Sequence, residues 1–201
     1  MFKRLLSHPG VEEVCELRSA FGFMAFHGGS LEEQTDVIAR LAAEKSGASY
    51  YGVHQPPDLK WHIDSHKIDP LDSPALASFI DHVDVVVTVH GYGRMGLFTT
   101  LLLGGKNREL ASHLAQHLRS WLPSYDIEHD LGQIPIGLAG QHPLNPVNLP
   151  RGGGVQLELP PRVRGRSPYW LNWDGPALTP HTQALVDGLA EAASSWPALT
   201  H

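Results

Sequence analysis

The chain alternates short apolar runs with longer amphipathic stretches, a pattern typical of proteins in which strands and helices alternate. Residues 83–90 predict a buried strand, because they are rich in valine and end at a glycine. Residues 107–122 carry leucines at helical spacing and predict an amphipathic helix. The pattern predicts strands at 21–27, 48–54, 59–65, 83–90, 96–103 and 154–159, helices at 31–46, 74–82, 107–122 and 179–196, and a long ordered loop at 131–153.

This order of elements predicts an α/β protein with a sheet between two layers of helices. At 201 residues and 22.0 kDa, the chain is long enough for one sizeable core and too short for two. We therefore expect a single domain over residues 1–201, with its core over about residues 11–196.

The start of the helix after the first strand affects the position of one carboxylate. Ser30 is expected to be the N-cap, and Glu33 would complete a capping box. Glu32 would then be free to turn back toward His27, since the intervening glycines permit positive φ.

Composition and charge exclude some classes of function. A net charge of -6 and a pI near 6.1 argue against a basic face for nucleic acid. No apolar stretch approaches the roughly 20 residues of a membrane helix, and the first residues lack the apolar core of a signal peptide. The single cysteine, Cys15, excludes an internal disulfide. We expect a cytoplasmic monomer without a signal peptide and without nucleic-acid or membrane partners, with release by cell lysis left open.

Two histidines each end a predicted strand and precede a glycine, namely His27 and His90. Because the carboxyl ends of parallel strands share one edge of a sheet, the two imidazoles are expected to be neighbours. With Glu32 they supply two nitrogens and one oxygen, a common ligand set of hydrolytic zinc sites. The alternative is that both histidines are core residues and Glu32 only favours the helix dipole.

A polar pair on a predicted strand offers a candidate base. Strand alternation places Gln156 and Glu158 on one face of residues 154–159. Burying both costs free energy unless they meet partners or a solvated cleft. A general base beside a metal site has such an environment. An edge strand with one exposed face is the alternative.

Other polar residues are less specific. Arg162 and Arg164 follow that strand and Arg108 begins a helix, and grouped arginines suit an anionic substrate because guanidinium binds carboxylates through two parallel bonds. His62 and His66 stand four apart in a segment expected to be extended, so they would not share a face as helical ligands do, and we assign them structural roles.

Four motifs together resemble the poly-γ-glutamate hydrolase family, which comprises phage and bacterial enzymes related to zinc carboxypeptidases. The resemblance runs from about residue 11 to residue 166, and it implies a zinc-carboxypeptidase-like, three-layer α/β/α fold with a mixed, mostly parallel sheet. The chain departs from the family at Ser30 and Gln34, where glycine is common. The motifs are AFHGGSLEEQT at 25–35, WHIDS at 61–65, VHG at 89–91 and GVQLELP at 154–160.

The resemblance also implies a reaction. By motif position, His27, Glu32 and His90 would bind one zinc ion per chain, and Glu158 would be the catalytic base. A zinc-activated water would then cleave γ-glutamyl amide bonds of an anionic polymer, which the resemblance implies is poly-γ-glutamate, or of a γ-glutamyl peptide.

Substrate-binding residues are implied more weakly. Arg164 matches an arginine that follows the glutamate strand in the family, and Asn107 with Arg108 resembles the carboxylate-binding pair of carboxypeptidases. Arg162 is expected to join them at the substrate carboxylates, and Arg94 to assist at the oxyanion.

Alternative functions remain open at this point. A zinc carboxypeptidase or an N-acyl amino acid deacylase would act on a different small anionic substrate, which the negative net charge favours over a polyanion. A non-catalytic binding protein that keeps the fold is the second alternative. Manganese or cobalt would also suit the ligand types.

Overall fold

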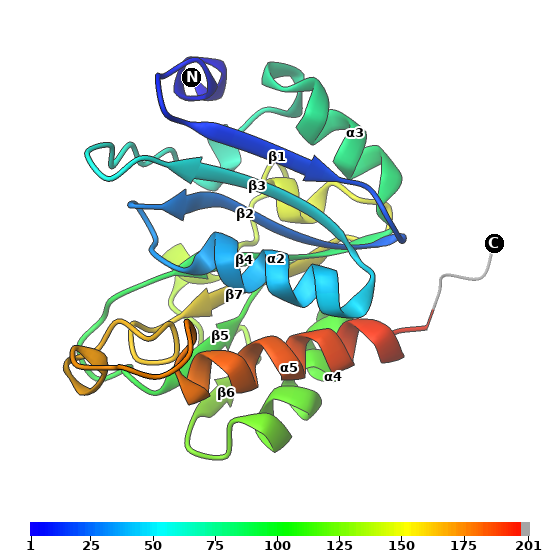
Figure 1. Cartoon of the computed structure of the whole chain (residues 1–201). Coiled ribbons are helices and arrows are strands. Elements are labelled where there is room, and N and C mark those ends of the chain that lie inside the picture. The colour runs from blue at the N-terminus through cyan, green and yellow to red at the C-terminus, as the bar shows by residue number, and fades with distance from the viewer. Residues whose placement is uncertain (198–201) are drawn as a thin grey trace.

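The computed structural model describes residues 1–197, which fold around one seven-stranded sheet (Figure 1). The strands lie in the order β1-β3-β2-β4-β7-β5-β6. The β1–β3 and β5–β7 pairs are antiparallel and the other neighbours are parallel, so the expectation of a mixed, mostly parallel sheet is confirmed. Residues 198–201 of the expected domain lie outside the described residues. The strands are β1 (Glu12–Glu16), β2 (Phe21–Gly29), β3 (Ser49–Gln55), β4 (Val85–Gly91), β5 (Thr100–Leu103), β6 (Asp126–Glu128) and β7 (Gly154–Leu159).

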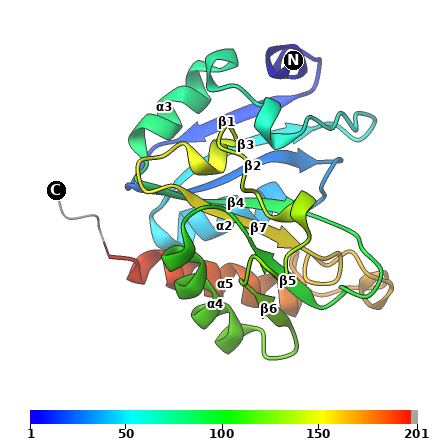
Figure 2. The ribbon, with the colours of Figure 1, turned by 180° about the vertical axis from the view of Figure 1, so that it is seen from behind.

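Helices cover both faces of the sheet, which confirms the three-layer arrangement. One core lies between the sheet and α2, α4 and α5 (Figure 1). A second core lies on the opposite face, where α1 and α3 pack with residues 61–68 and with part of the 131–153 loop (Figure 2). None of the described helices is long and apolar enough to cross a membrane. The helices are α1 (Phe2–Leu6), α2 (Thr35–Ser46), α3 (Pro74–His82), α4 (Arg108–Trp121) and α5 (Pro180–Ser195).

Regular alternation on β7 decides which side chains reach the second face of the sheet. Val155 and Leu157 lie in the core shared with α2, α4 and α5. Gln156 and Glu158 therefore point to the opposite face, as the sequence predicts. His90 on β4 is in register with Glu158, so both side chains leave the sheet on that face.

Strand β2 departs from regular alternation near its carboxyl end. Its register with β3 shifts between Ala25 and Gly28. Phe23 and Ala25 face the core with α2, α4 and α5, so unbroken alternation would send His27 to that face too. A β-bulge changes the direction of the side chains that follow it. Because of this irregularity, His27 lies beside His90, with ring centroids 4.9 Å apart.

The predicted capping box is wrong. Helix α2 begins at Thr35, with Gln34 at φ 75° as its N-cap and no side-chain cap bond. The Ser30 hydroxyl instead donates to the carbonyl oxygen of Pro56 at 2.7 Å. Ser30 thus ties the turn after β2 to the loop after β3, and the helix starts only after that turn is complete.

The predicted strand at 59–65 is also wrong. This segment is irregular and leads into a 3₁₀ turn at Ser65–Lys67. The side-chain amide of Gln55 binds both the N–H and the carbonyl of Trp61, at 2.8 and 3.0 Å, so these groups are satisfied without a sheet partner. The strand expected at 96–103 shortens to β5, and β1, β6 and α1 are elements that the pattern did not predict.

Candidate metal centre

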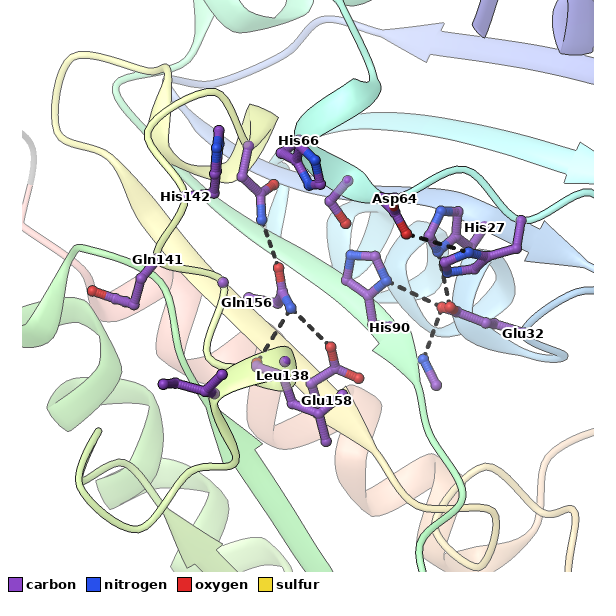
Figure 3. A pocket seen from close by; sticks show the side chains of 17 residues that line it. His27, Glu32, Asp64, His66, His90, Leu138, Gln141, His142, Gln156 and Glu158 are labelled. Atoms are coloured by element: carbon purple, nitrogen blue, oxygen red, sulfur yellow. Dashed lines mark hydrogen bonds and ion pairs between the residues drawn. The ribbon is translucent and has the colours of Figure 1, made fainter. Parts of the chain in front are cut away.

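Three side chains meet at the carboxyl ends of β2 and β4 (Figure 3). His27 Nδ1 lies 2.8 Å from Glu32 Oε1, and His90 Nδ1 lies 3.2 Å from Glu32 Oε2. The backbone N–H of Gly91 donates to Oε2 at 2.9 Å. The two histidine side chains are buried, and the Glu32 side chain is 13% exposed. The structure therefore brings the three predicted metal ligands together.

A closed turn positions Glu32. Its N–H donates to the carbonyl oxygen of His27 at 2.9 Å, and the Thr35 hydroxyl donates to the Glu32 carbonyl oxygen at 2.7 Å. Within the turn, Gly29 has φ 71°, and a Cβ there would collide with the backbone of Gln55. Glycine is needed at this point because the backbone has a left-handed conformation and packs directly against β3.

The hydrogen bonds of the two histidines suit a metal. His27 Nε2 lies 2.8 Å from the carbonyl oxygen of Ile63, which can only accept, so Nε2 carries the proton. In the neutral ring, Nδ1 then turns a lone pair toward the Glu32 carboxylate, an arrangement that a cation between them stabilises. His90 Nε2 is buried without a hydrogen-bond partner among the described residues. The donor types and their convergence fit a divalent transition metal.

His62 also reaches this group, although the sequence led us to assign it a structural role. Its ring centroid lies 4.9 Å from that of His27. His27, Glu32 and His62 each offer a ligand atom within 4.8 Å of the others. The irregular course of residues 61–64 brings His62 over the site, and an extended strand would not have done so.

The two carboxyl groups in the site differ in character. Burial alone would raise the pKa of Glu32, but His27 and His90 outweigh it and hold the pKa of that carboxyl well below its usual range. Glu32 is therefore ionised at neutral pH, as a metal ligand must be. Burial raises the pKa of Glu158 above its ordinary value. Opposite pKa shifts of this kind suit one carboxyl group to bind a metal and the other to exchange protons.

Glu158 is held by a chain of side-chain hydrogen bonds (Figure 3). Gln156 Nε2 donates to Glu158 Oε1 at 2.8 Å, and Asn145 Nδ2 donates to Gln156 Oε1 at 2.8 Å. All three side chains are buried. Gln156 and Glu158, which the sequence places on one face of the strand, are thus in direct contact, whereas Asn145 comes from the 131–153 loop and carries no sequence signal.

A cavity of about 500 Å³ opens over these residues. It is lined on one side by the metal-centre residues with Gln156 and Glu158, and on the other by residues 62–66 and the 131–153 loop. Among its described lining residues there is neither lysine nor arginine. Sequence reasoning did not assign His66, Gln141 or His142 to this cavity, because they lie in segments without periodicity.

Asn107 and Arg108 lie outside the lining of this cavity. Asn107 caps α4, where its Oδ1 accepts from the Leu110 N–H at 2.8 Å. The Arg108 guanidinium donates to backbone carbonyls around the start of the same helix. Those carbonyl oxygens belong to Leu103, Gly104, Gly105 and His129. Asn107 Nδ2 also donates to the carbonyl oxygen of Gly152 at 2.9 Å, so both residues donate to backbone carbonyls within the fold.

The remaining arginines are also not among the residues that line the cavity. Arg164 is buried and donates to the carbonyl oxygens of Glu33 and Leu159, at 2.8 and 3.3 Å. Arg162 lies over two tyrosine rings, at 5.6 and 5.7 Å from their centroids. Arg94 is exposed near the rim. The substrate-binding roles of these residues stay predictions.

Several solved structures share this fold. The structure of a bacteriophage poly-gamma-glutamate hydrolase is 21% identical, with a TM-score of 0.74 over 90% of this chain and 87% of that chain. A protein described as YNDL-apo (zinc-free) is 20% identical, with a TM-score of 0.76 over 92% and 90%. A gene product from Agrobacterium tumefaciens, Atu2144, is 16% identical, with a TM-score of 0.53 over 91% and 95%.

At these identities the likeness to solved structures establishes the fold alone, and no curated protein matches the chain. The family is established separately, by a family model described as poly-gamma-glutamate hydrolase that matches residues 4–167. The expected family is thereby confirmed, and the chain belongs to the poly-γ-glutamate hydrolases, a family of hydrolytic enzymes.

Proposed function

We propose that this protein is a zinc-dependent amidohydrolase that cleaves γ-glutamyl amide bonds, with poly-γ-glutamate as its substrate. The observation that carries the proposal is the convergence of His27 Nδ1 and His90 Nδ1 on the two oxygens of Glu32. Two imidazoles and one carboxylate are a common ligand set of hydrolytic zinc sites. The family match supports the substrate class, and the zinc-free description of YNDL-apo supports zinc as the metal.

In this proposal His27, Glu32 and His90 hold one zinc ion. Zinc, when bound, supplies a Lewis acid that polarises the amide carbonyl and makes water more acidic. Glu158 takes a proton from the attacking water and returns it to the leaving amine. Its raised pKa suits this exchange, because a base works best when its pKa lies near the working pH. Gln156 keeps the Glu158 carboxyl group oriented.

Elemental analysis of the wild type beside His90→Ala tests the metal centre. We expect about one zinc per chain in the wild type and its loss in the variant, which lacks one of three ligands. A wild type that contains no zinc and takes up none when zinc is added would contradict the metal centre and favour a non-catalytic binding protein.

Hydrolysis of poly-γ-glutamate and of γ-glutamyl peptides tests the reaction. Glu158→Gln keeps the size of the side chain and removes the base, so we expect it to retain zinc and to lose activity by about 10²–10⁴-fold. A zinc-loaded wild type that leaves both substrates intact would contradict the proposed substrate, while leaving the metal centre in place.

A further inference from the structure

The cavity contains a second pair of histidines, apart from the metal centre (Figure 3). His66 lies in the 3₁₀ turn Ser65–Lys67, and His142 lies in the 131–153 loop. Their ring centroids are 4.6 Å apart and their planes are tilted by 38°. Both residues line the cavity and both are exposed, so the pair lies at its mouth.

Both rings keep a donor for a ligand. The backbone N–H of Leu144 donates to His142 Nδ1 at 3.2 Å, so Nδ1 is an acceptor and the neutral ring carries its proton on Nε2. No group among the described residues hydrogen-bonds to the ring of His66. The nearby carboxylate of Asp64 is paired with Lys67 at 2.6 Å.

The N–H donors of the pair suit an anion as the ligand. No lysine or arginine is among the described lining residues, and the donors of Arg108 and Arg164 bind backbone carbonyls elsewhere. His66 and His142 therefore provide ring N–H donors at the mouth of the cavity, away from the metal centre, that can bind an anionic substrate. A second metal is not the expected ligand, because three potential metal-ligating side chains gather, among the described residues, only around His27.

We infer that His66 and His142 form a carboxylate-binding subsite for a γ-glutamyl unit next to the bond that is cleaved. The inference rests on the proposed function, under which each unit of the substrate carries a free carboxylate. The reacting carbonyl must lie at the metal centre, so a pair at the mouth contacts a neighbouring unit. Each ring contributes one N–H to the carboxylate, a hydrogen bond of the stronger, charge-assisted kind.

Replacement by phenylalanine tests the subsite, because His66→Phe and His142→Phe keep an aromatic ring and lose the N–H. Each variant is assayed with a γ-glutamyl oligomer and with the same oligomer after amidation of its carboxylates. We expect KM for the acidic oligomer to rise about tenfold, since one hydrogen bond to a charged group is lost. The preference for the acidic over the amidated oligomer should fall by the same factor in KM, with zinc content unchanged. His82→Phe, at an exposed histidine of α3, is the matched control and keeps the wild-type preference.

Calorimetric binding of the acidic oligomer to Glu158→Gln protein, with and without each phenylalanine substitution, separates the subsite from the reaction. Binding that weakens about tenfold in both variants supports the subsite even if the wild type hydrolyses neither oligomer. Hydrolysis by the wild type with an unchanged preference in both variants overturns the subsite and leaves the proposed function in place. An acidic oligomer that is neither bound nor hydrolysed overturns both.

Discussion

Gln156 donates a hydrogen bond from Nε2 to Glu158 Oε1 at 2.8 Å, along the face of β7 that lines the cavity. The oxygen of the same amide accepts from Asn145, and its nitrogen also donates to the carbonyl oxygen of Leu138 at 3.3 Å. Gly140 packs directly on this side chain, since a Cβ there would lie 2.7 Å from Gln156 Cβ. Gln156 therefore joins the 131–153 loop to the carboxyl group that we propose as the base.

Replacing Gln156 by leucine removes this donor while nearly conserving volume. We expect kcat on poly-γ-glutamate to fall about tenfold, because Glu158 loses the bond that orients it. Zinc content should stay at the wild-type level, since no proposed ligand is altered. Gln183→Leu is the control, because Gln183 binds Asp187 on the exposed side of α5. A folded Gln156→Leu enzyme with wild-type kcat would show that the hydrogen bond does not position Glu158.

Either His90 or His62 could be the third ligand beside His27 and Glu32, and their alanine variants should differ in zinc retention. His90 is buried and contacts the Glu32 carboxylate, as His27 does. His62 is exposed, and its Nδ1 lies 3.8 Å from Asp64 Oδ1. We expect His62→Ala to keep its zinc under dialysis against a chelator and His90→Ala to lose it, because a buried ligand is held in place by its surroundings. Elemental analysis of the dialysed proteins decides this. The reverse result would assign the metal to His27, Glu32 and His62.

Gly29 and Gly47 have nearly the same φ, 71° and 70°, in different surroundings. A Cβ at Gly47 would have nothing within 4 Å, whereas one at Gly29 would collide with the backbone of Gln55. Gly47→Ala should cost about 1 kcal/mol in the free energy of unfolding, the cost of a left-handed alanine. Gly29→Ala should cost about 3 kcal/mol, because the backbone must also shift. Urea denaturation measures both, and equal losses would contradict the close contact at Gly29.

The sequence predicts the face of a side chain well where strands are regular. His90 and Glu158 lie on β4 and β7, where alternation is unbroken, and both point as the pattern requires. The sequence correctly predicts the edge of the sheet at which His27 lies. The face of the sheet that its side chain occupies depends on the irregularity between Ala25 and Gly28. A bulge is decided by the pairing with β3, and the apolar run of β2 alone does not indicate it.

Residues that would touch the substrate are harder to predict. An arginine in the sequence can bind a ligand or a backbone carbonyl, and Arg108 and Arg164 bind backbone carbonyls at the ends of strands and loops. Which of the two an arginine binds depends on parts of the chain that are distant in sequence. His142 reaches the cavity from a loop whose course follows from contacts such as that of Asn145 with Gln156, so no local pattern indicates it.

A pH-sensitive contact joins the start of α5 to the segment after α4. The Tyr125 hydroxyl lies 2.6 Å from His181 Nδ1. Burial raises the pKa of Tyr125 to about 12, so the hydroxyl is protonated at neutral pH and donates to the neutral imidazole. Burial, followed by the charge of Arg162, lowers the pKa of His181 below its ordinary value of 6.5. Trp170 also packs edge-on against the ring, with centroids 5.1 Å apart.

Because the pKa of His181 is lower in the folded protein, the unfolded chain binds the proton first as pH falls. The stability that depends on neutral His181 is complete above the unfolded value and declines as pH falls from there toward the folded value. Wild type should therefore lose more stability than His181→Gln between about pH 7.5 and about pH 5. Urea midpoints across this range measure the difference, with His82→Gln as an exposed control. If the stability of wild type relative to His181→Gln stays constant or increases toward low pH, folding does not disfavour the proton on His181.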